Sequence, residues 1–403
     1  MATALSKKLL KYVKRKGFGD SIADSKFANV TDYLPMKAHS MNLLASAGVD
    51  NGVPVGKSLM LAGPKSSGKT ILALSVMKAA QDKGYTIIYW DAEFAAFEES
   101  FESMGINTDE VIHVPMASLN DIKTAYVNLV KEIEEDEKVL HVFDSMGAWI
   151  TDKTIKDAES GNDARDMTIS SSKKTFMTII NESCGKKNMG AVIINHSYAN
   201  IGGYGAATTV SGGGALYLPS VIIEMKSKAK WKVKDEVIGS IFNAECVKGR
   251  MSKEYGKAKY AISQKKGIAP YYGLIDYAVA GGYLTETTFN RNKAYQITHH
   301  LEVDPDAKKF VQHDWETIYY SDEIFPVLYE ETNFKEYLAA EFAYGDDVVV
   351  ASLAKQKKKT KPKTSTKLKN VLNVSSSENS KVENKTSIET NEKTTETEEF
   401  KVS

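Results

Sequence analysis

The chain has 403 residues, of which 42% are hydrophobic and 26% charged, and its formal net charge is zero. This is the composition of an ordinary globular protein, and the balanced charge means that any nucleic-acid binding must come from local basic patches. The two cysteines, Cys184 and Cys246, are too far apart in sequence for a metal-binding spacing. We expect neither a signal peptide nor a membrane span, and the simple interpretation is a reduced, cytoplasmic compartment.

Residues 1–34 are predicted to form an N-terminal helix or arm. Apolar residues recur at three- and four-residue steps from Leu5 to Val13 among several lysines, which is typical of a short amphipathic helix. Gly17 and Gly19 end it. The helix either packs on its own domain or docks as an arm on a neighbouring subunit, and the sequence leaves both interpretations open.

An apolar run at residues 58–62 leads into a glycine-bounded loop and then an apolar helix that runs to about Lys83. The loop has the pattern of a phosphate loop, in which backbone N–H groups and the N-terminus of the helix favour phosphate oxygens. Lys69 is predicted to reach the β- and γ-phosphates, and the Thr70 hydroxyl to bind Mg²⁺. A chance match is the alternative, but the flanking strand and helix disfavour it. The predicted nucleotide-binding residues of the loop are Gly63, Pro64, Lys65, Ser66, Ser67, Gly68, Lys69 and Thr70.

Residues 85–91 are almost continuously apolar, as expected of a strand buried on both faces of a parallel sheet. This strand ends in Asp91-Ala92-Glu93, where ligands bind in open α/β sheets. Glu93 either deprotonates a water that attacks the γ-phosphate or caps the following helix. The neighbouring phosphate loop favours the catalytic role.

The alternation of helices and strands continues with a helix to about Met104, a strand at 111–114 and a helix at about 119–136. The next strand, 138–145, carries Asp144 at its end, which is a Walker B arrangement. Asp144 is predicted to hold Mg²⁺ through water. His113 and His141 lie within strands, and we interpret them as satisfied core or surface histidines.

Residues 151–164 are polar and are predicted to form a loop, followed by a helix from about Arg165 to Cys184. A buried strand at 190–196 ends in His196, which either hydrogen-bonds a γ-phosphate or has no role. The segment 197–214 contains six glycines, at positions 202, 203, 205 and 212–214, and we predict a mobile loop that orders on a partner.

The rest of the chain is predicted to add a hairpin, a small subdomain and a tail. Three basic clusters accompany the predicted hairpin of residues 221–247 and the strand that follows it, and they form local positive patches. Residues 286–351 have helix and turn signals of a small C-terminal subdomain. Residues 352–403 are first lysine-rich and then acidic, and they are predicted to be disordered because they have too little apolar surface to bury.

Together these motifs resemble the RecA-like recombinases, and more closely the UvsX recombinases of tailed phages. Their order and spacing match from about residue 35 to residue 285. The resemblance implies an α/β fold: a RecA-type P-loop ATPase core at 35–285 with a central, mostly parallel sheet, preceded by a short arm. The residues that carry the resemblance are Gly63–Thr70, Asp91–Glu93, Lys138–Ser145, Ile194–His196 and Gly212–Ala215.

The resemblance also implies an activity. Proteins of this kind are DNA-dependent ATPases that form helical filaments on single-stranded DNA, with ATP and Mg²⁺ between subunits, and exchange strands with homologous duplex. Glu93 matches the family's catalytic glutamate, and His196 lies where a side chain senses the γ-phosphate. Lys248 and Arg250 match a basic pair that reaches the neighbouring subunit's ATP and stabilises the transferring phosphoryl group.

The predicted DNA contacts are Arg165, Tyr198 and Ile201, in two loops that match the family's DNA-binding loops. The expected partners are single- and double-stranded DNA, further copies of the chain, and single-strand-binding and mediator proteins. If the chain is of phage origin, its compartment is the host cytoplasm. The chain departs from the family at one position. The family usually has a tyrosine that stacks on adenine, and here that position is Ser100, followed by Phe101.

Three other functions fit the motifs less well than a recombinase does. A hexameric replicative helicase normally has a sizeable domain before the phosphate loop, where about 60 residues stand here. An ATP-switched recombination mediator would not need Lys69, Glu93 and Asp144 together. A small-molecule kinase would leave the glycine-rich loop and the basic pair unexplained.

Overall fold

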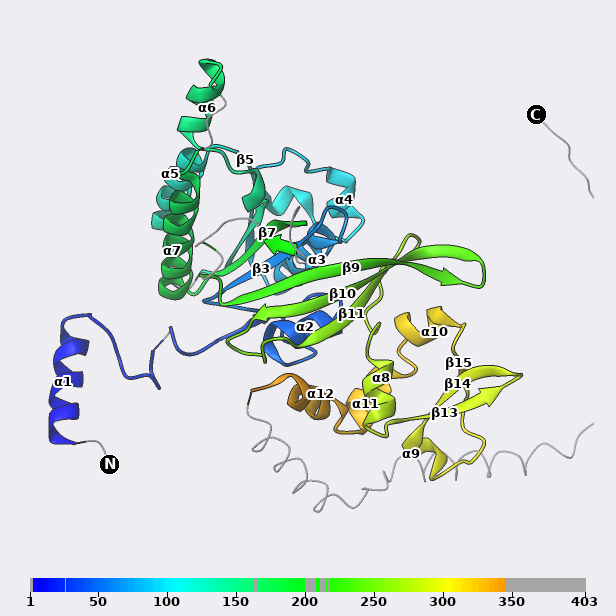
Figure 1. The fold of residues 1–403 in the computed structure, drawn as a ribbon. Coiled ribbons are helices and arrows are strands. Elements are labelled where there is room, and N and C mark those ends of the chain that lie inside the picture. Colours follow the sequence, from blue (N-terminus) through cyan, green and yellow to red (C-terminus); the bar gives the residue numbers. More distant parts are fainter. Residues whose placement is uncertain are drawn as a thin grey trace, which may run out of the picture. The chain divides into compact units, whose positions relative to one another are not determined.

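The computed structural model describes residues 3–25, 27–135, 137–162, 166–199, 208–210, 215 and 218–344, with the backbone only at 198–199 and 208–210 (Figure 1). Among these residues, no helix has the length and apolar character needed to cross a membrane. The predictions for Arg165, Ile201, the glycines at 202–205 and 212–214, and the tail at 352–403 lie outside the described residues. So does the side chain of Tyr198.

A ten-stranded sheet organises the chain, in the order β12-β11-β10-β9-β3-β7-β6-β4-β5, with β8 paired to β7. The strands from β9 to β5 in this order are mutually parallel, whereas β10, β11 and β12 extend the sheet in antiparallel fashion. The predicted mostly parallel α/β sheet is therefore confirmed. The strands are β3 (Ser58–Gly63), β4 (Thr86–Asp91), β5 (Val111–Pro115), β6 (Val139–Asp144), β7 (Gly190–Ala199), β8 (Thr208–Val210), β9 (Val221–Val233), β10 (Glu236–Lys248), β11 (Lys257–Ser263) and β12 (Gly267–Ile268).

Both faces of the central strands β3, β4 and β6 are buried, which is why their sequences read as apolar runs instead of alternating with polar residues. The parallel edge strand β5 is partly exposed. Successive side chains point to opposite faces of a strand. Leu59 and Leu61 therefore pack with α3 (Lys69–Asp82), while Met60 packs with α5 (Leu119–Glu132) and α7 (Ile169–Lys187). The two core clusters are the two faces of one sheet, and the loops at the strand ends are left to bind ligands.

Three features near the sheet differ from the prediction. The segment 197–214, predicted as a mobile loop, contains the end of β7 at 197–199 and strand β8 at 208–210, which pair with each other. The segment 151–164, predicted as a loop, contains helix α6 (Asp152–Glu159). Its N-cap is Thr151, whose hydroxyl accepts a hydrogen bond from the Thr154 amide, and Lys153 pairs with Asp157 one turn on. These local bonds stabilise a polar helix that apolar periodicity does not reveal. The helix predicted up to Met104 is the short α4 (Glu98–Glu102).

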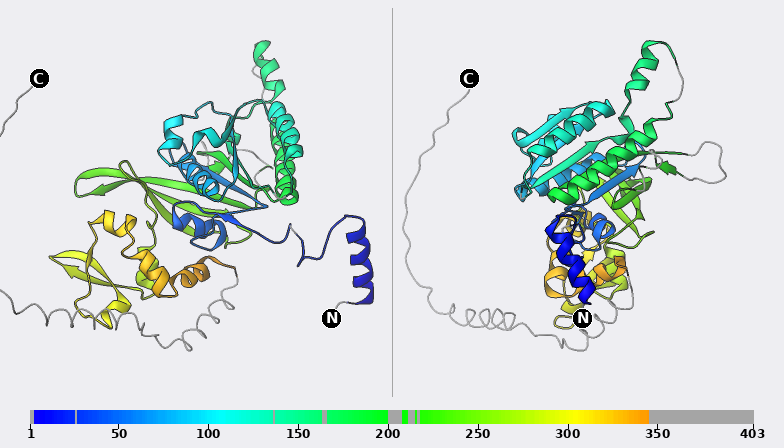
Figure 2. Two further views of the ribbon diagram at one scale, coloured as in Figure 1. Left: turned by 180° about the vertical axis from the view of Figure 1, so that it is seen from behind. Right: turned by 90° about the vertical axis from the view of Figure 1, so that its left-hand side faces the viewer.

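The predicted hairpin is confirmed and is longer than expected. The basic stretch that begins at residue 226 continues β9 as far as Val233, so β9 and β10 form a ribbon that extends beyond the neighbouring strands (Figures 1 and 2). The side chains of residues 226–230 are exposed, as expected where the ribbon extends beyond the neighbouring strands.

The N-terminal helix is α1 (Ala4–Arg15), and all its residues are at least partly exposed. The chain then enters the core through β1 (Tyr33–Leu34), α2 (His39–Ser46) and β2 (Val53–Pro54).

The C-terminal part has a three-stranded sheet and five helices among its described residues. Its aromatic side chains Phe325 and Phe334 belong to the same buried cluster as α2 and α3. The elements are α8 (Ile275–Ala280), β13 (Leu284–Phe289), β14 (Asn292–Ile297), α9 (Thr298–Leu301), β15 (Phe310–Val311), α10 (Trp315–Tyr320), α11 (Phe325–Glu331) and α12 (Phe334–Phe342).

Candidate nucleotide-binding site

The strand register brings the predicted site residues to one edge of the sheet. Gly63 at the end of β3 lies beside His196 of β7, and Asp91 at the end of β4 lies beside Asp144 of β6. Parallel strands all present their carboxyl ends at the same edge, so residues far apart in sequence meet there. The phosphate loop between β3 and α3 opens onto this edge.

The phosphate loop turns tightly into α3. Gly68 caps the helix with φ +81°, a conformation that favours glycine, and a Cβ there would lie 2.7 Å from Ile262 Cδ1, which would have to shift. Lys69 is buried, and its Nζ donates to the carbonyls of Gly63 at 3.0 Å and Pro64 at 2.8 Å. Burial lowers the pKa of Lys69, although the charges of Asp144 and Glu93 oppose the shift. The ammonium is thus held inside the loop, facing the acids across the site.

Asp144 is buried at the end of β6 and is held by two hydroxyl groups. Its Oδ2 accepts hydrogen bonds from Thr70 Oγ1 and from Tyr89 OH, both at 2.9 Å. Burial raises the pKa of Asp144; the two hydrogen bonds oppose this, and the charges of Glu93 and Asp91 add to it. A hydroxyl and a carboxylate in contact, within an excess of negative charge, are oxygen donors that fit Mg²⁺.

Glu93 lies on the loop after β4, with its side chain 34% exposed. Its Oε1 accepts hydrogen bonds from Ser145 Oγ and, at 2.8 Å, from His196 Nε2. Burial would raise the pKa of Glu93, but the hydrogen bonds from Ser145 and His196 and the nearby positive charges lower it overall. The carboxylate is therefore kept ionised, as a general base must be.

Helix capping does not explain Glu93. Helix α4 begins at Glu98, with Phe97 at its N-cap, so Glu93 lies outside the helix terminus. The loop is organised instead by Asp91, whose carboxylate accepts the backbone N–H groups of Glu93, Ala95 and Ala96 at 3.0–3.3 Å. These bonds hold the backbone that carries Glu93 at the end of the sheet.

His196 connects the acidic group to the strand that leads to the glycine-rich segment. A Cβ at Gly147 would lie 2.6 Å from His196 Cδ2, so the chain after β6 approaches the imidazole closely. Beyond His196, β7 continues to Ala199 and pairs with β8 in antiparallel register. The imidazole is thus in contact with Glu93, and His196 directly precedes the residues of β7 that pair with β8.

Lys248 and Arg250 lie at the opposite edge of the sheet. Lys248 is paired in register with Ile222 near the start of β9, and its Nζ donates to the Pro219 carbonyl at 2.7 Å. Arg250 lines a cavity with Lys57, the residue before β3. Both cations are thus directed toward the amino-terminal end of β3, whereas the phosphate loop follows its carboxyl end.

The sequence does not predict the role of several residues at the site. Tyr89 looks like a core aromatic within an apolar strand, yet its hydroxyl binds the Walker B carboxylate. Tyr260, on the distant β11, donates to the Ser67 carbonyl under the phosphate loop. Ser145 follows Asp144 through a cis peptide bond and contacts Glu93. Only the position of Tyr89, two residues before Asp91 on the same strand face, could have suggested its role.

Phe101 does not take the place of a stacking tyrosine. It is 7% exposed and packs edge-on against Tyr89, with ring centroids 5.2 Å apart. Ser100 lines a cavity of about 1000 Å³ together with Ile71 of α3 and residues 262–268 of β11 and β12. Among the described residues, α4 therefore places no aromatic side chain in this cavity beside α3.

Comparisons with known proteins show the family of the chain. The RecA N-terminal domain family matches residues 5–269. The recombination and repair protein of Enterobacteria phage T4 is 29% identical over 266 residues, covering 65% of this chain and 67% of that protein. Protein RecA of Rickettsia africae is 31% identical over 247 residues (60% and 69%), and that of Rickettsia canadensis is 30% identical over 283 residues (68% and 79%).

The chain belongs to the RecA family. It is accordingly a recombinase and a DNA-dependent ATPase, and the predicted family is confirmed.

Proposed function

We propose that the chain binds ATP with its phosphates against the backbone of residues 63–70 and hydrolyses it as part of a filament on DNA. The observation that carries this proposal is the meeting of Lys69, Asp144, Glu93 and His196 at one edge of the sheet. Thr70 and Asp144 would hold Mg²⁺, which offsets charge on the β- and γ-phosphates. Lys69 would turn from the loop carbonyls to the phosphate oxygens.

Glu93 would act as the general base. Its ionised carboxylate accepts a proton from a water as the water oxygen attacks the γ-phosphorus. The bond from that phosphorus to the bridging oxygen breaks, and ADP leaves with the electron pair. Ser145 and Asp91 hold the carboxylate and its loop in position, and Lys69 stabilises charge on the departing side.

His196 would report the γ-phosphate to the DNA-binding segment. Its Nε2 lies 2.8 Å from Glu93, and its strand continues into the β7–β8 pair that borders residues 200–207. A γ-phosphate oxygen that competes for Nε2 would shift the imidazole, and with it the backbone of β7. This contact offers a physical route between nucleotide state and DNA binding.

Lys248 and Arg250 would complete the site of the next subunit. Both cations lie at the edge of the sheet away from their own phosphate loop, which supports action in trans. Their charge would stabilise the transferring phosphoryl group in the manner of arginine fingers. Each phosphate loop is then half of a site, and the filament supplies the other half.

For DNA we propose contacts from three residues: Arg165, which follows α6 in the sequence, Tyr198, near the end of β7, and Ile201, which follows β7 in the sequence. A guanidinium suits phosphate, while an aromatic and an aliphatic side chain suit the faces of bases. Single-strand-binding and mediator proteins are proposed as further partners, and the cytoplasm, of the host for a phage protein, as the compartment.

Two paired measurements test this function. ATP turnover is expected to rise when single-stranded DNA is added, and electron micrographs are expected to show helical filaments. Turnover that is indifferent to DNA, together with closed rings on the grid, would contradict the proposal and favour a helicase-like assembly.

A further inference from the structure

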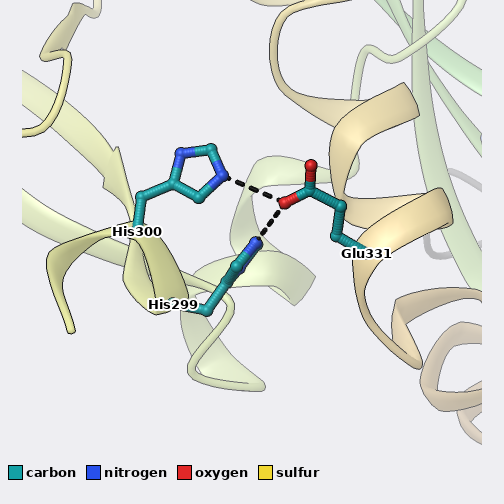
Figure 3. Close-up of side chains that lie close together, drawn as sticks. All are labelled: His299, His300 and Glu331. Atoms are coloured by element: carbon teal, nitrogen blue, oxygen red, sulfur yellow. Dashed lines mark hydrogen bonds and ion pairs between the residues drawn. The ribbon is translucent and has the colours of Figure 1, made fainter. Parts of the chain in front are cut away.

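The C-terminal part of the chain brings two histidines and a glutamate together, away from the nucleotide site. His299 and His300 are consecutive on α9, and Glu331 is the last residue of α11 (Figure 3). Glu331 Oε2 lies 2.7 Å from His299 Nε2 and 3.1 Å from His300 Nε2. The three donor atoms all lie within 4.8 Å of one another.

This donor set and its spacing suit a metal ion. Two imidazole nitrogens and one carboxylate oxygen are ligands typical of Zn²⁺, whereas Mg²⁺ and Ca²⁺ prefer oxygen alone. In a tetrahedral site with bonds of about 2.0–2.2 Å, neighbouring donor atoms are roughly 3.3–3.6 Å apart. The observed spacing therefore needs only small side-chain adjustments to admit an ion between the three groups.

The side chains are 32%, 42% and 47% exposed for His299, His300 and Glu331. This exposure lets an ion enter without unfolding and lets water complete its coordination. Figure 3 shows both imidazole rings turned toward the same carboxylate oxygen from one side. Three protein ligands and an open fourth position are a common arrangement for zinc.

The elements that carry the ligands are held in place independently of them. Tyr283 joins the two sides: its backbone carbonyl accepts from the Thr298 amide at 3.0 Å, and its hydroxyl donates to Asn333 Oδ1 at 3.0 Å. Thr298 begins α9, and Asn333 follows α11 by two residues. Ligands on elements that are already fixed lose little freedom on binding an ion.

The geometry points to a binding site for a divalent transition-metal cation of the Zn²⁺ class, with His299 Nε2, His300 Nε2 and Glu331 Oε2 as its protein ligands. The bound ion would tie α9 to the end of α11 and so brace the C-terminal part of the chain. This site is separate from the phosphate loop and uses none of the residues proposed for ATP.

Zinc titration of the full chain tests the site. The protein is freed of metal with a chelator, kept in excess Mg²⁺ to saturate oxygen-donor sites, and titrated with Zn²⁺ by calorimetry. The wild type is expected to bind one ion at this site, and its thermal unfolding midpoint is expected to rise with Zn²⁺. His300→Asn and Glu331→Gln are each expected to weaken binding at least about 10-fold and to abolish the rise.

His313→Asn is the matched control, because His313 is an exposed histidine outside the cluster. It should bind Zn²⁺ like the wild type. Glu331→Gln keeps the size of the side chain and its hydrogen-bonding oxygen, so it remains informative if a histidine variant folds poorly. The inference is overturned if the wild type takes up no Zn²⁺, or if Glu331→Gln binds and is stabilised as the wild type is; the cluster is then an ion pair alone.

Discussion

Replacing Glu93 by Gln separates catalysis from binding at the proposed site. The amide oxygen of Gln can still accept the hydrogen bonds from Ser145 and His196, so the loop should keep its position. The side chain no longer takes a proton, and a positioned general base contributes about 10²–10⁴-fold to a rate. Because each tenfold change is about 1.4 kcal/mol, the barrier should rise by roughly 3–5.5 kcal/mol.

Steady-state ATP hydrolysis on single-stranded DNA measures this loss, and a fluorescent ATP analogue measures nucleotide affinity. We expect turnover of Glu93→Gln to fall at least about 100-fold while the affinities for the analogue and for DNA stay unchanged. Glu99→Gln, at an exposed acid of α4, should behave as the wild type. A loss of turnover below tenfold, or a loss of nucleotide binding instead, would refute the role of Glu93.

Three further predictions concern stability and DNA. Tyr89→Phe removes a buried hydrogen bond to Asp144, and urea unfolding should show a loss of about 1.5–3 kcal/mol, with exposed Tyr255→Phe unchanged. Burial lowers the pKa of His39 from 6.5 to about 4, so its contribution to stability is present above pH 6.5 and is lost as the pH falls through about 4. In His39→Gln the free energy of unfolding should depend less on pH between 6.5 and about 4 than it does in the wild type. An acid-induced loss as steep as that of the wild type would contradict this. DNA affinity should fall steeply with added salt, because phosphate contacts dominate, and a flat dependence would oppose that reading.

The sequence predicts the parallel sheet well because the evidence for it is local. Apolar runs bounded by Gly63, Asp91 and Asp144 identify strands and place polar residues at their ends. Strand order then brings these ends together, since parallel strands share one ligand-binding edge. The sequence alone therefore predicts that the phosphate loop, Glu93, Asp144 and His196 meet.

Contacts that depend on distant packing could not be predicted in this way. Tyr260 reaches the phosphate loop from β11, almost 200 residues further along the chain, and nothing in its local sequence marks it. The same holds for the meeting of His299 and Glu331, which requires the position of α11. Helix α6 is not predictable from apolar periodicity for a different reason: a cap and an ion pair stabilise it, and none of its residues is buried.

The central claim is that each ATP site is shared between two subunits, and mixing two inactive variants tests it most directly. Lys69→Ala lacks the phosphate-loop cation, and Arg250→Ala lacks the cation proposed to act in trans. Mixed on single-stranded DNA, they should regain part of the ATP turnover, because some interfaces pair an intact loop with an intact Arg250. Arg250→Ala mixed with the double variant should regain none. If the first mixture is no more active than the sum of its parts, Arg250 does not complete a neighbour's site.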